Sequence, residues 1–219
     1  MKSMENIVKL NLDTEDVLDA FDLKRHIGGA LLDEWLNYDM ILVENDIKQL
    51  ERKRLQLQNE GEYWNEEELK MHFLAILFEM AQIEETEKIK LFYERPLLAT
   101  IHGYEINVVC DAMLATPKGV GKPKKPYFFL QEFKKQKGKS QDAEGQMLAA
   151  MLVAQIENEN AQPVYGCYIQ GKYWTFTVLQ NKNYYVAASF DATNSLHLHK
   201  IIAALKNIKN IVLKQLQSI

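Results

Sequence analysis

Apolar residues recur every three to four positions in four parts of the chain, which is the spacing of one face of a helix. These parts are residues 14–58, with a break near Gly28 and Gly29, and residues 66–85, 143–157 and 196–216. Asn65 and Asp142 stand just before the second and third parts, where a short polar side chain caps the first turn. The third part is apolar nearly all round, so we expect this helix to be buried.

Between these helical parts, β-branched and aromatic residues form short runs that are bounded by turn residues. The runs cover residues 90–93, 97–102, 104–115, 127–135, 165–169, 173–179 and 184–190. The Pro, Gly and Lys residues of 116–126 join the third and fourth runs into a long hairpin. The order of helices and strands predicts an α+β fold, with residues 1–60 as an N-terminal helical extension and residues 61–219 as the main domain.

The composition is that of an ordinary globular protein, with 219 residues of which 47% are hydrophobic and 26% charged. Cys110 and Cys167 lie far apart and show no disulfide pattern. No apolar run approaches the length of about 20 residues that spans a bilayer, and the first residues lack the apolar core of a secretory signal. We therefore expect a cytoplasmic protein that has no membrane partner.

The net charge of −4 is unevenly distributed along the chain. Residues 118–139 contain eight lysines and a single acid, Glu132, whereas acids are concentrated in residues 60–68 and 79–87. A local cluster of lysines is a suitable footprint for phosphates. We therefore expect a nucleic-acid interface at Lys118, Lys122, Lys124, Lys125, Lys135, Lys137 and Lys139.

Three charged residues stand in otherwise apolar strands. In the run that ends the hairpin, alternation places Glu132 and Lys134 on one face, and Asp111 lies in the apolar run before it. Buried charges are costly unless they are paired or bind a metal. Antiparallel pairing can bring Asp111 next to Glu132, and two carboxylates make a hard-oxygen site that suits Mg²⁺ or Mn²⁺. An adjacent lysine completes a set of groups that suits phosphodiester hydrolysis.

Asp111, followed after 20 residues by Glu132-Phe133-Lys134 and then by a helix, resembles the signature of the PD-(D/E)XK nuclease superfamily. The resemblance covers roughly residues 62–180 and implies a restriction-endonuclease-like core with the element order α-β-β-β-α-β. It also implies an Mg²⁺- or Mn²⁺-dependent nuclease, in which Asp111, Glu132 and the main-chain carbonyl of Phe133 bind the metal. Lys134 would act at the attacking water.

The resemblance extends to the two core helices. It implies that a glutamate of the first helix adds to the site, and Glu66 matches best because it lies on the sheet-facing side. Gln146 resembles a glutamine that several branches carry on the second core helix. The chain departs from the pattern at Cys110, which replaces the proline of the motif, and at Ala150, where members of exonuclease type carry tyrosine.

These residues also have simpler interpretations. Asp111, Glu132 and Lys134 can form a structural ion pair, and Glu66 can interact with the helix dipole. Gln146 can satisfy backbone groups, and the lysine loop can be a solvated hairpin tip. His197 and His199 lack further ligands nearby, and the aromatic residues of 165–174 are more typical of a core.

The leading hypothesis is a DNA endonuclease of a defence or repair process, with DNA favoured over RNA and a homodimer possible. One alternative is a non-catalytic nucleic-acid-binding or assembly module that keeps the nuclease fold. The other is a protein-interaction module built on the charged helix of residues 40–58.

Overall fold

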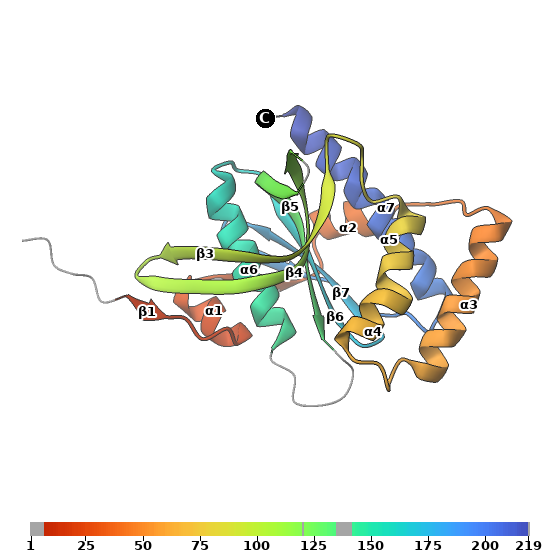
Figure 1. The fold of residues 1–219 in the computed structure, drawn as a ribbon. Coiled ribbons are helices and arrows are strands. Elements are labelled where there is room, and N and C mark those ends of the chain that lie inside the picture. Colours follow the sequence, from red (N-terminus) through yellow and green to blue (C-terminus); the bar gives the residue numbers. More distant parts are fainter. Residues whose placement is uncertain (1–6, 120, 135–141, 219) are drawn as a thin grey trace, which may run out of the picture.

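A mixed β-sheet runs through the middle of the computed structural model, which describes residues 7–119, 121–134 and 142–218 (Figure 1). Its described strands are β1 (Val8–Lys9), β2 (Lys24–Ile27), β3 (Lys90–Ile101), β4 (Tyr104–Lys118), β5 (Lys122–Lys134), β6 (Val164–Gln170), β7 (Tyr173–Gln180), β8 (Asn183–Val186) and β9 (Phe190–Asp191). The main path through the sheet is β1-β4-β5-β6-β7-β8-β2, with β3 paired to β4 and β9 paired to β7. The predicted combination of helices and strands is thus confirmed as a mixed α and β architecture.

The centre of the sheet combines antiparallel and parallel pairing. The strands β3, β4 and β5 form an antiparallel meander, and β6 then pairs with β5 in parallel. A parallel partner requires a crossover connection, and α6 (Ala143–Asn158) lies in that connection. Asp142 caps α6 by accepting a hydrogen bond from the backbone N–H of Gly145, as its position in the sequence predicts.

Helices cover both faces of the sheet (Figure 1). On one face, α6 packs mainly over β5 and β6, and the short helix α1 (Thr14–Ala20) packs against α6, with Val17 and Met147 buried in the same hydrophobic cluster. The other face carries the helices α2 (Ala30–Leu36), α3 (Glu44–Glu60), α4 (Glu66–Leu69), α5 (Ala75–Ala81) and α7 (Ser195–Gln217). The helix α6 is buried along most of its length, as we expected from its apolar sequence.

The N-terminal segment contributes to the sheet as well as to the helical layers. We expected residues 1–60 to be helical, but β2 pairs in parallel with β8, and β1 pairs with the start of β4. Trp35 of α2 is fully buried, and its Nε1 donates a hydrogen bond to the carbonyl oxygen of Ala204, at 2.9 Å. The N-terminal helices therefore share a hydrophobic core with α7.

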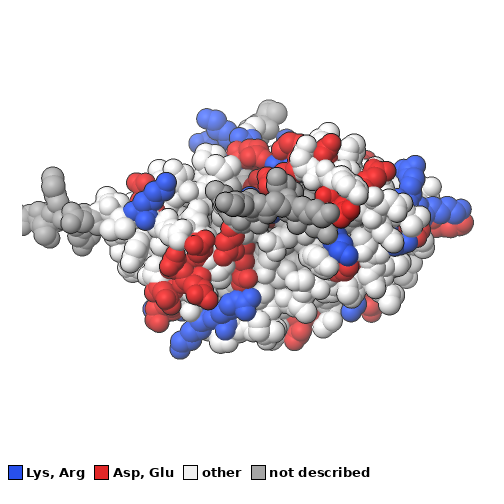
Figure 2. All heavy atoms as spheres, turned by 90° about the horizontal axis from the view of Figure 1, so that it is seen from below, with Lys and Arg blue, Asp and Glu red and all other residues white. Residues whose placement is uncertain are grey.

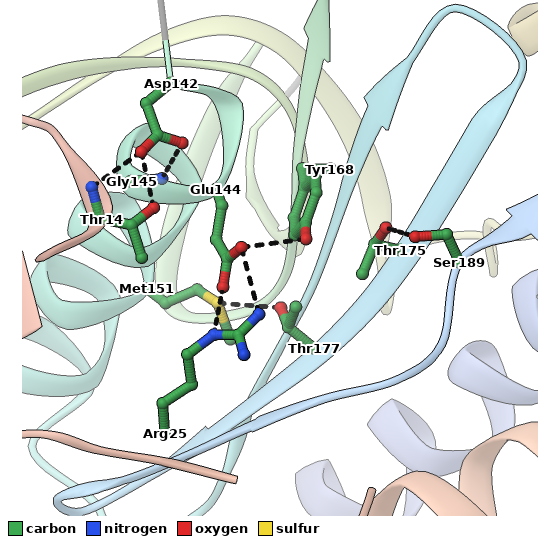
Figure 3. A network of polar contacts seen from close by, with 10 residues as sticks. All are labelled: Thr14, Arg25, Asp142, Glu144, Gly145, Met151, Tyr168, Thr175, Thr177 and Ser189. Carbon is green, nitrogen blue, oxygen red and sulfur yellow. Dashed lines mark hydrogen bonds and ion pairs between the residues drawn. The ribbon is translucent and has the colours of Figure 1, made fainter. Parts of the chain in front are cut away.

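A polar network joins this segment to the start of α6 (Figure 3). Asp142 accepts hydrogen bonds from the backbone N–H and from the hydroxyl of Thr14, at 2.8 and 2.7 Å. Glu144 forms an ion pair of 2.9 Å with Arg25 and accepts a hydrogen bond from the hydroxyl of Tyr168. These contacts fix the beginning of α6 against α1, β2 and β6.

The fold also settles several predictions about single residues. Cys110 and Cys167 are both buried and free. The runs 90–93 and 97–102 form one strand, β3, although it contains Pro96, which an edge strand tolerates. Within the described residues, no helix is both long and apolar enough to cross a membrane.

Candidate functional site

Asp111 and Glu132 occupy facing positions on neighbouring strands. The antiparallel register of β4 and β5 pairs Ala112 with Gln131, so Asp111 and Glu132 stand at the next position along the two strands. The backbone N–H of Phe133 donates a hydrogen bond to Oδ2 of Asp111, at 2.7 Å. Asp111 is 8% and Glu132 3% exposed, so both carboxylates are buried. The sheet register brings the two acids together, as the sequence predicts.

An ion pair within β5 also belongs to the site. The Lys134 ammonium donates to Oε1 of Glu132, at 2.6 Å, and the two side chains are 12% and 4% exposed. Burial, together with the charge of Asp111, raises the pKa of Glu132 to about 7 in spite of the Lys134 ammonium. Burial also raises the pKa of Asp111, although the Phe133 N–H acts in the opposite direction. Both acids therefore lie in an environment that disfavours negative charge unless cations are close.

The helix that faces these strands contains a π-helical turn. The residues of α4 are followed without a break by the π-helix η1 (Lys70–Leu74) and then by α5. Asn65 caps this helix in a capping box with Glu68, which confirms the predicted start. Gln82 adopts a left-handed conformation with φ of 50°, so the helix ends at Ala81 rather than at residue 85 as we expected.

The π-helical turn changes which side chains face the core. The 100° spacing of an α-helix places Ile76 and Met80 on the buried side, but both are only half-buried. Leu74 and Phe78 are buried instead. A π turn contains an extra residue, so the sides of the helix before and after it differ from the pattern of an uninterrupted α-helix.

Lys70, which sequence reasoning missed, lies among the acids of the site. Its Nζ lies 2.6 Å from Oε1 of Glu94, 3.1 Å from Oε1 of Glu67 and 3.6 Å from Oδ1 of Asp111. Its side chain is 15% exposed. Burial disfavours the charged form of Lys70, but the contacts with these acids outweigh burial and raise its pKa. The spacing of three residues between Glu67 and Lys70 could have indicated their contact within the helix, but not the approach of Lys70 to Asp111.

Glu94 is also part of the site and was not anticipated. The register of β3 and β4 pairs Tyr93 with Ala112 and Arg95 with Cys110, so Glu94 lies across from Asp111. Glu94 adopts a positive φ of 50°, which is uncommon for a residue other than glycine. A charged residue in an edge strand is usually solvated, so nothing in the local pattern singled it out.

Among the acids of the facing helix, Glu66 is the one whose charge acts on both Glu132 and Lys134. Glu68 is engaged in the capping box, and Glu79 lines a different pocket. Glu67 contacts Lys70 while its side chain stays 75% exposed. The half-buried position of Glu66 thus agrees with the sheet-facing side that we expected.

A pocket of about 530 Å³ opens beside Asp111. Glu66, Lys70 and Glu94 line its polar side together with Asp111. Its apolar side is formed by Met71, Leu74, Phe78 and Tyr93. The Asp111 carboxylate is therefore accessible from a cavity rather than enclosed in the sheet.

The described lysines of the proposed nucleic-acid interface lie at the other end of the hairpin. Lys118 is seven residues along β4 from Asp111, about 23 Å at the usual rise of a strand. Lys118, Lys122, Lys124 and Lys125 are exposed, and Lys125 forms an ion pair of 2.5 Å with Glu157. Lys135, Lys137 and Lys139 lie outside the described residues. On the face where β5 ends and α4 begins, acidic side chains gather (Figure 2).

Other residues from the sequence analysis have defined places. Gln146 is half-buried in the first turn of α6. His197 accepts a hydrogen bond from the backbone N–H of Asp191 through Nδ1, at 3.0 Å. Tyr165 and Trp174 are buried, as is typical of core aromatics, whereas Tyr173 is 44% exposed.

The donor set at the site suits a cation that keeps most of its own water. Among the residues that the structure describes, no group of three or more His, Cys, Asp or Glu side chains is arranged to hold a metal. Magnesium commonly uses only one or two carboxylates and completes its shell with waters and phosphate oxygens. Asp111 and Glu132, which repel each other in a buried setting, fit that mode of binding.

Neither a protein-family model nor any curated protein sequence matches the chain. The function is therefore inferred from the geometry and chemistry of the site.

Proposed function

We propose that the protein is a metal-dependent nuclease of the PD-(D/E)XK type that hydrolyses phosphodiester bonds. The observation that carries this proposal is the buried Glu132–Lys134 pair beside Asp111. The element order supports it, because the α4–α5 helix, β3, β4, β5, α6 and β6 follow one another as in a restriction-endonuclease-like core. The parallel pairing of β6 with β5 is consistent with the same core.

In this proposal the chain's own groups divide the chemistry. Asp111, Glu132 and the carbonyl oxygen of Phe133 would hold Mg²⁺ or Mn²⁺, which when bound polarises the phosphate and lowers the pKa of a water. Lys134 would then donate hydrogen bonds to the attacking water and to the negative charge that grows on the phosphate. Glu66 would bind an outer water of the site, and Gln146 would contact Lys134 or the substrate.

DNA is the substrate we propose, and an endonuclease of a defence or repair process in the cytoplasm is the corresponding role. A homodimer, with one catalytic centre for each strand, is the form that we propose for cleavage of a duplex. The lysines of the hairpin tip would then hold phosphates far from the scissile bond, because Lys118 lies about 23 Å along β4 from Asp111.

The ammonium groups beside Asp111 and Glu132 favour a second, non-catalytic function. Each acid already has an ammonium nearby, since Lys134 contacts Glu132 and Lys70 approaches Asp111. Such compensation is what a structural ion-pair network requires. A non-catalytic nucleic-acid-binding or assembly module on the same fold is therefore the alternative proposal.

A cleavage assay separates the two functions. Supercoiled plasmid is incubated with the protein and Mg²⁺ or Mn²⁺, and nicking is compared between the wild type and Asp111→Asn. The nuclease proposal expects nicking by the wild type that EDTA and the substitution both abolish. Binding of DNA by both proteins without any nicking would favour the non-catalytic module.

A further inference from the structure

Lys70 lies at the meeting point of three acids that come from different elements. Glu67 belongs to α4, Glu94 to β3 and Asp111 to β4, and Lys70 itself begins the π-helical turn. Its ammonium also lies 5.8 Å from the centre of the Phe133 ring. Lys70 is therefore held by groups on the helix and on the sheet at the same time.

The contact between Lys70 and Asp111 concerns the carboxylate that the proposed function assigns to the metal. Oδ2 of Asp111 accepts the hydrogen bond of the Phe133 N–H, and Oδ1 faces the Lys70 ammonium at 3.6 Å. A divalent cation on this carboxylate would lie close to the ammonium, and charges of the same sign repel strongly at such distances when they are partly buried. The cation and the Lys70 ammonium thus compete for the same negative charge.

The other two acids provide a place for the displaced ammonium. Glu94 and Glu67 already lie closer to Nζ than Asp111 does, at 2.6 and 3.1 Å. Their side chains are 58% and 75% exposed, so they lie at the open side of the pocket. A lysine has a flexible four-carbon stem, which allows its ammonium to move by a few ångströms without a change in the backbone.

We propose that Lys70 is an internal counter-ion that neutralises Asp111 when no metal is bound and is displaced toward Glu67 and Glu94 when a divalent cation binds. This inference deepens the proposed nuclease function, because it assigns to the same site a residue that sets its affinity for metal. Lys70 acts here as a positioning residue that controls occupancy of the site. We therefore expect a cation to occupy the site only when it binds Asp111 more strongly than the Lys70 ammonium does.

The test measures Mn²⁺ binding by titration calorimetry and by the electron paramagnetic resonance signal of free Mn²⁺, both without DNA. The proteins are the wild type, Lys70→Met and Lys70→Arg, at about pH 8 so that Glu132 is ionised. Methionine keeps the length and apolar stem of the side chain but removes the charge. We expect Lys70→Met to bind Mn²⁺ about fivefold more tightly, a change that corresponds to the loss of one competing ion pair. Lys70→Arg keeps a positive charge and should bind nearly as weakly as the wild type.

Two controls separate direct competition from a general change in charge. Lys209→Met removes a lysine whose partner is Glu85, at 2.9 Å, outside the pocket, and should leave Mn²⁺ affinity unchanged. A titration in about 0.5 M salt screens exposed charges, so an effect that persists there arises at short range. Asp111→Asn added to Lys70→Met should remove the gained affinity, and thermal unfolding monitored by circular dichroism verifies that each variant is folded.

The outcomes distinguish this inference from the proposed function. Equal or weaker Mn²⁺ binding by folded Lys70→Met would overturn it, as would the absence of Mn²⁺ binding in every variant. Tighter binding that depends on Asp111 would support it even if no protein nicks DNA, in which case the proposed nuclease activity alone fails.

Discussion

The Lys134 ammonium and the Glu132 carboxylate lie 2.6 Å apart on alternate residues of one strand, with both side chains largely buried. Alternate residues of a strand project from the same face, so the sequence alone makes them neighbours. Their burial is what makes the pair costly, and Asp111 adds a second negative charge beside Glu132. This cost should be visible in the stability of the protein and in its response to pH.

Stability should depend on pH through Glu132. Its pKa rises from an ordinary value near 4.5 to about 7 in the folded protein. Between these two values the unfolded chain is ionised at this position while the folded chain keeps the proton, so raising the pH lowers the free energy of unfolding. We expect Glu132→Gln to gain stability relative to the wild type as the pH rises from about 4.5 to 7.5, by at most about 3 kcal/mol. Urea unfolding of both proteins without metal ions measures this difference, and parallel curves across the range would contradict it.

Replacing Lys134 by Ala should abolish cleavage while leaving DNA binding largely intact. In the proposal, Lys134 donates hydrogen bonds to the attacking water and to the transition state. Loss of one such hydrogen-bond donor lowers the rate about a hundredfold or more. Plasmid nicking and filter binding are measured on the same protein preparations. Lys172→Ala, which removes a lysine paired with Asp191, is the matched control. Undiminished metal-dependent nicking by Lys134→Ala would remove this residue from the mechanism.

The hairpin-tip lysines should contribute to affinity rather than to chemistry. Substitution of Lys122 and Lys124 by Ala should weaken DNA binding broadly and reduce the log-log salt slope by about 0.9 for each phosphate that the variant no longer neutralises. Lys125 already pairs with Glu157, so its replacement should matter less. The measurement is filter binding at several salt concentrations, with Lys182→Ala as a control because that lysine pairs with Asp22. An unchanged slope would show that the tip is only solvated.

Gly145 should tolerate no side chain. A Cβ at this position would lie 2.1 Å from the carbonyl oxygen of Leu12 and 2.7 Å from the backbone N of Thr14. Because backbone atoms cannot turn aside, Gly145→Ala should separate α6 from the N-terminal segment and cost about 2 kcal/mol or more. A Cβ on Gly121 would meet nothing within 4 Å, so Gly121→Ala should change stability by less than about 0.5 kcal/mol. Equal unfolding midpoints for both variants would refute the close packing.

The elements with a strong hydrophobic period were predictable from the sequence. Asn65 and Asp142 begin their helices as expected, and the terminal helix α7 extends over nearly the predicted residues. The strand β2 was missed because its four residues show neither alternation nor an apolar core, and its pairing with β8 depends on a distant part of the chain. Long-range pairing can override weak local preference.

The residues of the site also divide into those that the local sequence indicates and those that only the fold brings together. Asp111, Glu132 and Lys134 stood out because charges in apolar strands need a reason. Lys70 and Glu94 belong to a helix and an edge strand in which charged residues are ordinary, and only the folded arrangement brings them to Asp111. Their contribution depends on tertiary contact, which no local pattern encodes.

The π-helical turn at Lys70–Leu74 determines how the sequence of this helix would align with that of any homologue. A π turn arises from an α-helix when one residue is inserted, and removal of that residue restores the α-helix. A relative that lacks the insertion would therefore need a one-residue gap in the middle of this helix to align Glu66 with its own acid. An alignment that keeps the helix ungapped would match either the core residues or the site residues, but not both. A one-residue gap within residues 70–74 would bring both sets of residues into register.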